Sequence, residues 1–129
     1  MEDATGGCLC GAVRYRVRAP LRNVVNCHCG QCRRWHGHVG AYTEVPREAV
    51  ELTESRGLKW FQSSAHARRA FCAECGSSLF WDALKGAEFG IAAGTLDGPT
   101  GLETVAHIFT RYAGDYYRID DGLPKSSRE

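Results

Sequence analysis

Hydrophobic and polar residues alternate along much of the chain, which is the pattern of short β-strands with one buried face. The clearest case is the segment AVRYRVR at 12–18. There Val13, Tyr15 and Val17 fall on one face, and the arginines between them fall on the other. We expect a half-buried strand whose arginine face lies in water, and a phosphate-binding face is the alternative. The same pattern predicts strands at residues 23–26, 39–45, 58–62, 68–72, 78–82, 89–96 and 104–112.

Helical signals are scarce, because turn residues interrupt the chain at short intervals. Glycine, proline and Asp-Gly pairs leave little room for a long helical pattern. One or two helical turns are predicted at 30–36. Another is predicted at 46–50, where Pro46 suits the first position of a helix. The sequence therefore predicts a mainly β fold of short antiparallel sheets with little helix.

The length and charge of the chain limit its organisation and its partners. With 129 residues we expect a single domain at 1–124, followed by a polar tail at 125–129. The net charge of +1 gives no reason to expect nucleic acid or an anionic membrane as a partner. The sequence shows no secretory signal and no run of about 18 apolar residues, so we expect a cytoplasmic protein that does not span a membrane.

Seven cysteines carry the chemical interest of this sequence. Cytoplasmic thiols stay reduced and an odd number cannot all pair, so metal binding or catalysis is favoured over a disulfide framework. The cysteines fall into three clusters, which are an early C-x-C pair, a middle C-x-C-x-x-C group and a late C-x-x-C pair. Each cluster is a candidate contributor to a metal site.

The early and late pairs together supply the four thiolates of a structural zinc site. Each pair is followed by a glycine, Gly11 or Gly76, which can adopt the positive φ of a tight turn. Zn–S bonds of about 2.3 Å require sulfurs within roughly 4 Å of one another, and a site joining such distant segments contributes directly to folding. A redox motif and ordinary free thiols are the alternatives. The predicted ligands are Cys8, Cys10, Cys72 and Cys75.

The middle cluster places Cys27, Cys29 and Cys32 within six residues. Three protein ligands and an open fourth position are typical of a catalytic zinc, whereas structural sites are closed by four ligands. A distant fourth protein ligand and the absence of any metal are the alternatives. We do not expect His28 to be a ligand, because the middle residue of an extended C-x-C segment points away from its neighbours.

The residues directly after the middle cluster, RRWHG at 33–37, are candidates for contacts with a substrate. Arg33 or Arg34 can hold a carboxylate through two hydrogen bonds. Trp35 can form an apolar wall, and His36 can transfer a proton. A solvated arginine pair and a core tryptophan are the alternative interpretations.

Six segments, in order along nearly the whole chain, resemble one known family. They are GGCLCGAVRY (6–15), CHCGQCRRWHG (27–37), FCAECGSSLF (71–80), AAGTLD (92–97), HIF (107–109) and DDGLP (120–124). Together they resemble the glutathione-dependent formaldehyde-activating enzymes, a family that also includes centromere protein V. The resemblance implies a small zinc-bound fold of the β-tent type. It also implies two zinc ions per chain, one structural at the four-cysteine set and one catalytic at the three-cysteine set.

The resemblance also implies an activity. It indicates a carbon–sulfur lyase type of enzyme that joins a thiol, glutathione or a similar one, with a small aldehyde such as formaldehyde. A non-catalytic zinc-stabilised binding module and a cysteine redox protein without zinc are the alternatives. The expected partners are small thiol and aldehyde substrates, with no nucleic acid and no membrane, while a homo-oligomer stays open.

Overall fold

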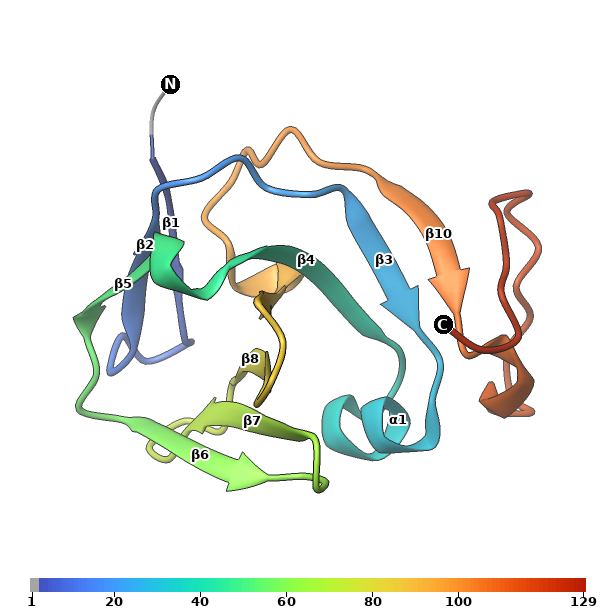
Figure 1. Cartoon of the computed structure of the whole chain (residues 1–129), viewed down its shortest axis with the longest axis horizontal. Helices are drawn as coiled ribbons and strands as arrows, with labels where there is room; N and C mark the ends of the chain where they lie inside the picture. The colour runs from blue at the N-terminus through green and yellow to red at the C-terminus, as the bar shows by residue number, and fades with distance from the viewer. Residues whose placement is uncertain (1–2) are drawn as a thin grey trace.

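The computed structural model describes residues 3–129, which form two β-sheets and a single short α-helix (Figure 1). In chain order the strands are β1 (Ala4–Gly7), β2 (Arg14–Val17), β3 (Val24–Cys27), β4 (Gly40–Pro46), β5 (Val50–Glu54), β6 (Leu58–Gln62), β7 (Ala67–Cys72), β8 (Ser78–Ala83), β9 (Glu88–Ala92) and β10 (Thr104–Ile108). The smaller sheet has the strand order β1-β2-β5, and the larger has the order β10-β3-β4-β9-β8-β7-β6. The prediction of a mainly β fold is confirmed.

Helical structure is limited to short pieces. The helix α1 (Gly30–His36) coincides with the helix predicted at 30–36, and single turns of 3-10 helix form η1 (Arg47–Ala49), η2 (Ala93–Thr95) and η3 (Thr110–Tyr112). The helix predicted at 46–50 is reduced to η1, because Val50 already begins the extended strand β5. No helix within residues 3–129 has the length and apolar character that crossing a membrane requires.

The main core lies between the two sheets and is built from the alternation seen in the sequence. Val13, Tyr15 and Val17 are each at most 1% exposed. The ring of Tyr15 meets that of Phe80 edge-on with centroids 5.3 Å apart, and Phe80 in turn contacts Phe89 at 5.0 Å. These aromatic contacts join β2 of the small sheet to β8 and β9 of the large one and bury apolar area on both.

All eight predicted strands are present, but those predicted at 89–96 and 104–112 end earlier, at Ala92 and Ile108, and single 3-10 turns follow. The sequence pattern does not predict β1 or β5. The sequence of β1, ATGG, shows no hydrophobic alternation. It becomes a strand by pairing with β2, where Gly6 lies opposite Tyr15. A Cβ atom on Gly6 would lie 2.3 Å from the Tyr15 hydroxyl, so this position accepts only glycine. The strand therefore depends on its neighbour and not on its own composition.

One strand pair departs from the expected antiparallel arrangement. Strand β10 pairs parallel to β3, which brings Ile108 level with Cys27. Parallel neighbours need a long connection, and the chain between β3 and β10 supplies it. The segment at 125–129, predicted to be a tail, continues beside β10, where the Ser126 N–H donates to the His107 carbonyl at 2.9 Å. The end of the chain thus lies near the end of β3 (Figure 1).

Candidate metal centres

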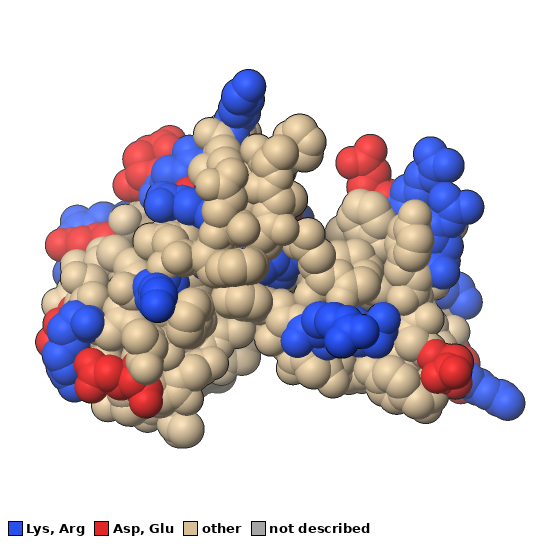
Figure 2. Space-filling view, turned by 90° about the horizontal axis from the view of Figure 1, so that it is seen from below, with Lys and Arg blue, Asp and Glu red and all other residues tan. Residues whose placement is uncertain are grey.

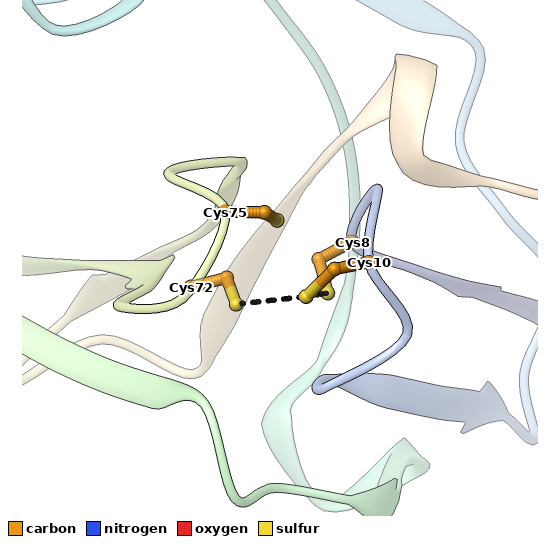
Figure 3. Close-up of side chains that lie close together, drawn as sticks. All are labelled: Cys8, Cys10, Cys72 and Cys75. Carbon is orange, nitrogen blue, oxygen red and sulfur yellow. Dashed lines mark hydrogen bonds between the residues drawn. The ribbon is translucent and has the colours of Figure 1, made fainter.

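The early and late cysteine pairs meet in space and form a four-cysteine centre (Figure 3). Cys8 and Cys10 lie in the connection between β1 and β2. Cys72 ends β7, and Cys75 lies in the turn to β8. Each residue offers a sulfur, and these atoms all lie within 4.8 Å of one another. The structure thus joins two hairpins at one point, as the spacing of the cysteines predicted.

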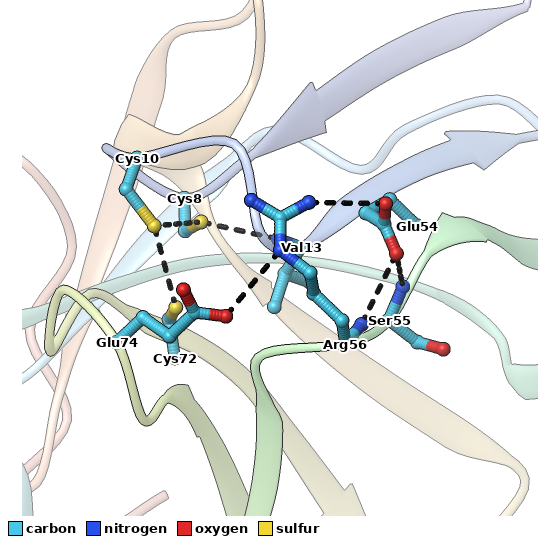
Figure 4. A network of polar contacts seen from close by, with 8 residues as sticks. All are labelled: Cys8, Cys10, Val13, Glu54, Ser55, Arg56, Cys72 and Glu74. Atoms are coloured by element: carbon cyan, nitrogen blue, oxygen red, sulfur yellow. Dashed lines mark hydrogen bonds and ion pairs between the residues drawn. The ribbon is translucent and has the colours of Figure 1, made fainter.

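The geometry of the four-cysteine centre fits zinc. The Sγ atom of Cys10 lies 3.7 Å from that of Cys8 and 3.8 Å from that of Cys72. Tetrahedral coordination with Zn–S bonds of about 2.3 Å places neighbouring sulfurs about 3.8 Å apart. All four thiols are free of disulfides, and the Val13 N–H donates to Cys8 Sγ at 3.2 Å (Figure 4). This backbone donor stabilises negative charge on the sulfur, as a metal-bound thiolate requires.

Glycines make room for the turns of this centre. Gly11 and Gly76 have φ angles of 86° and 83°, so the predicted positive φ at both positions is confirmed. A third glycine, Gly57, approaches the centre from the start of β6. A Cβ atom there would lie 2.8 Å from Cys72 Sγ and 2.8 Å from the Cβ atom of Ala12. Backbone approaches the sulfurs too closely at this point for any side chain.

The arginine beside the four-cysteine centre is neutralised by carboxylates. Arg56 pairs with Glu54 at 3.1 Å and with Glu74 at 3.4 Å, and its side chain is 57% exposed (Figure 4). Exposed ion pairs of this kind contribute little to stability. The positive charge of Arg56 is therefore compensated by carboxylates at the surface and needs no negative charge from the sulfurs.

The middle cysteines form a second, local centre at the start of α1. Cys27 ends β3, Cys29 is the N-cap of α1, and Cys32 lies in its first turn. The three sulfurs lie within 4.8 Å of one another, and the backbone N–H of Cys32 donates to Cys29 Sγ at 3.3 Å. The strand end and the helix cap together aim the sulfurs at one point. No fourth His, Cys, Asp or Glu joins this group within residues 3–129.

The three neighbouring sulfurs do not ionise alike. Hydrogen bonds from Cys27 and then Cys32 hold the pKa of Cys29 well below its usual range. Hydrogen bonds with Cys29 and Cys32 raise the pKa of Cys27 in turn. One sulfur ionises readily while its neighbours keep protons, because adjacent thiolates repel one another. A divalent cation can replace these protons, so the donor set fits zinc here as well.

A chain of side chains connects the three-cysteine centre to His36. Arg69 in β7 is 3% exposed, and its Nη2 lies 3.5 Å from Cys32 Sγ. Its Nη1 donates to the Tyr42 hydroxyl at 3.3 Å, and that hydroxyl lies 2.6 Å from His36 Nε2. A guanidinium can only donate, so the hydroxyl oxygen accepts from Arg69. Burial, and then the charge of Arg69, lower the pKa of His36 to about 4.

His28 lies between two of the cysteines but faces away from the sulfurs. It is 2% exposed, and its Nδ1 lies 2.6 Å from the Tyr117 hydroxyl. Its Nε2 lies 2.8 Å from Nδ1 of His107, whose Nε2 lies 2.8 Å from a carboxylate oxygen of Asp121. These contacts fix the end of the chain against the cysteine loop. They agree with the expectation that His28 is not a ligand.

A groove of about 470 Å³ runs beside α1. Its lining includes Arg33, Arg34 and Arg69, and also Trp35 and Phe61, whose rings stack at 6.0 Å. The Nε atoms of Arg33 and Arg69 are buried without a hydrogen-bond partner in residues 3–129. Figure 2 views the molecule from below, the side on which α1 and β6 lie in Figure 1, and this face is hollowed and bordered by Lys and Arg side chains.

Only some of the residues predicted to contact a substrate line the groove. Arg33 lines the groove, whereas His36 is bonded to Tyr42. Sequence reasoning missed Arg69, although one signal was present. In the strand ARRAFC it shares an inward face with Ala67, a position at which a charged residue is unusual. Tyr42 and the partners of His28 carried no such signal.

The chain is similar to known proteins in sequence and in structure. An uncharacterized lyase of Schizosaccharomyces pombe is 30% identical over 82 residues, which are 63% of this chain and 58% of that protein. The match therefore spans less than two thirds of the lyase. The crystal structure of a Rhodobacter sphaeroides protein is similar with a TM-score of 0.63 and 25% identity, over 75% of this chain and 91% of that one. The family model of the glutathione-dependent formaldehyde-activating enzymes matches residues 3–112, and the chain belongs to this family.

Proposed function

We propose that this chain is a zinc-dependent enzyme of the carbon–sulfur lyase type, which joins a thiol with a small aldehyde such as formaldehyde. The observation that carries the proposal is the group of three sulfurs, Cys27, Cys29 and Cys32, beside a groove. Membership of the formaldehyde-activating family and a relative named as a lyase support the class of reaction. Seven free thiols suit a reducing compartment such as the cytoplasm.

Two zinc ions per chain follow from the two centres. The four-cysteine centre would hold a structural zinc, because four protein ligands leave no position for a substrate. The three-cysteine centre would hold the catalytic one. Cys27, Cys29 and Cys32 would hold this ion and leave a fourth position open, where it would bind a substrate thiol as thiolate or polarise an aldehyde oxygen; the soft sulfur donors favour the thiol.

The reaction is an addition without a change of oxidation state overall. The thiol sulfur forms a bond with the carbonyl carbon, the π bond of the carbonyl opens, and the thiol proton passes to the carbonyl oxygen. The protein has to bring two small molecules together and to direct one proton. Orientation of two reactants in one site is a large part of such catalysis.

The groove beside α1 provides contacts for the thiol substrate. Arg33 and Arg34 line the groove with two positive charges, and the Nε atom of Arg33 is buried without a hydrogen-bond partner within residues 3–129. These groups suit a carboxylate, and the stacked rings of Trp35 and Phe61 suit the apolar part of a chain. A thiol that carries carboxylates, as glutathione does, matches both features. We therefore assign Arg33 to hold a substrate carboxylate.

His36 is the nearest candidate for the proton transfer along the same helix. Its pKa of about 4 keeps it neutral near pH 7, and a proton that it accepts there is passed on and not held. Its Nε2 already forms a hydrogen bond with the Tyr42 hydroxyl. His36 would therefore act on the substrate through Tyr42 or through its other ring nitrogen.

Exchange of a thiol with its aldehyde adduct tests the proposal. Glutathione and formaldehyde also form the adduct without a catalyst, and exchange NMR measures the rate with and without the zinc-loaded protein. We expect acceleration by the wild type, a large loss in Cys29→Ser, and a higher thiol concentration at half-saturation in Arg33→Met. No acceleration with any pair of thiol and aldehyde would contradict an enzyme and favour a zinc-stabilised binding module.

A further inference from the structure

Arg69 is a buried positive charge that has no carboxylate partner within residues 3–129. It is 3% exposed and is the only buried arginine within residues 3–129. Its hydrogen-bond partners there are the sulfur of Cys32 and the hydroxyl of Tyr42, and its Nε has none. A buried charge left uncompensated is strongly destabilising, so a guanidinium in this position needs negative charge close by.

Within the described part of the chain, the buried carboxylate Asp82 shows how the fold normally compensates a buried charge. Asp82 is 2% exposed and is paired with two arginines, Arg47 and, at 2.9 Å, Arg68. Arg68 is the neighbour of Arg69 in β7, but its side chain points to the opposite face of the strand. Two consecutive arginines therefore have different partners. One faces a carboxylate, and the other faces the sulfurs of the three-cysteine centre.

The three-cysteine centre with a metal ion would supply the negative charge that Arg69 requires. A divalent metal ion with three thiolates carries one net negative charge, which the guanidinium of Arg69 balances. An anionic fourth ligand adds a second negative charge, and a neutral ligand adds none. A fixed cation in contact with Cys32 stabilises the first case more than the second, and the effect is strong because water is largely excluded.

We propose that Arg69 is the fixed counter-ion of the three-cysteine centre and makes it prefer an anionic fourth ligand, a thiolate, over a neutral one. This inference rests on the proposed function, in which the centre binds a metal ion and a thiol. Arg69 also lines the groove beside α1, so the same charge attracts an anion toward the centre. It is a positioning residue, because it acts through the charge of the centre.

Ligand binding to cobalt-substituted protein tests the proposal without any turnover. Cobalt(II) reports its ligands through its visible absorption, and the closed four-cysteine centre does not respond to an added ligand. We would titrate 2-mercaptoethanol, which binds as thiolate, and imidazole, which is neutral, at one fixed pH. In Arg69→Met we expect the thiol affinity to fall by about tenfold or more and the imidazole affinity to stay nearly unchanged. Arg69→Lys, which keeps the charge, should retain most of the thiol affinity.

Arg56→Met is the matched control, because Arg56 lies beside the other centre and pairs with carboxylates. It should change neither affinity. If Arg69→Met does not retain cobalt at the three-cysteine centre, Arg69→Gln and Arg69→Lys provide the same comparison of neutral and charged side chains.

The outcomes separate this inference from the proposed function. An equal loss of affinity for both probes in the neutral variant would show a structural role only and overturn the inference. Unchanged affinities for both probes would overturn it as well. If the wild type itself binds neither probe, the fourth position is not available and both the proposed function and the inference fail.

Discussion

The Nε2 atom of His28 lies 2.8 Å from the Nδ1 atom of His107, and the two rings are buried side by side. Asp121 accepts the Nε2–H of His107, so the Nδ1 of a neutral His107 is an acceptor. His28 must then donate from Nε2 and accept at Nδ1 from the Tyr117 hydroxyl. The carboxylate of Asp121 therefore fixes the donor and the acceptor of every hydrogen bond in this row, from His107 to Tyr117.

Removal of the Tyr117 hydroxyl, at the other end of this row of hydrogen bonds, should destabilise the fold. Tyr117→Phe leaves the buried Nδ1 of His28 without a donor, which typically costs about 1–3 kcal/mol. Tyr116→Phe is the matched control, because Tyr116 is 59% exposed and its partner His38 is exposed too. Denaturant unfolding at neutral pH measures both. Equal losses of unfolding free energy would contradict the importance of the His28 contact.

The two metal centres should respond differently to loss of one ligand. Cys72→Ser should unfold or aggregate, because the four-cysteine centre joins segments that are distant along the chain. Cys27→Ser should remain folded and retain one metal ion per chain, because its centre is local. Metal analysis and circular dichroism measure the result. The division into a structural and a catalytic centre would be wrong if both variants unfolded alike, or if the wild type bound a single zinc ion.

Two glycines next to the sulfurs provide an independent test of the same division. Gly57→Ala brings a methyl group against Cys72 Sγ and should destabilise the fold by about 1–3 kcal/mol. Gly40→Ala brings one within 2.9 Å of Cys32 Sγ and should lower metal occupancy at the three-cysteine centre while the fold remains. Gly94→Ala is the control, because a Cβ atom there meets nothing within 4 Å. Similar behaviour of all three variants would contradict this placement of the sulfurs.

Stability should fall as the solution becomes acidic. The pKa of His36 is lowered to about 4 by burial and by the charge of Arg69, so the unfolded chain binds its proton more readily than the folded one. The contribution of neutral His36 is fully present above the ordinary pKa of about 6.5 and is lost as the pH falls toward 4. Unfolding free energies of the wild type and His36→Gln across this range measure it. A variant with the same pH dependence as the wild type would show that His36 contributes nothing.

The sequence alone was sufficient for most of the strands, for α1 and for the grouping of the cysteines. Alternation in AVRYRVR identified β2, because a strand with one buried face must place Val13, Tyr15 and Val17 on that face. The glycine after each cysteine pair indicated a tight turn, because Gly11 and Gly76 can adopt a positive φ. Such a turn brings the two sulfurs of a pair close together, so each pair was predicted to supply two ligands. Local rules of spacing and backbone conformation sufficed in both cases.

The tertiary structure decided what depends on contacts between distant segments. Strand β1 exists because Tyr15 covers Gly6, and β10 runs parallel to β3 because the chain between them is long enough to return. The burial of Arg69 against Cys32 and the pairing of His28 with His107 are of the same kind. Residue type gives the chemistry that a side chain can perform. The neighbours that make this chemistry useful, such as a compensating charge or a partner for a buried ring nitrogen, are brought together only when the sheets close around the core.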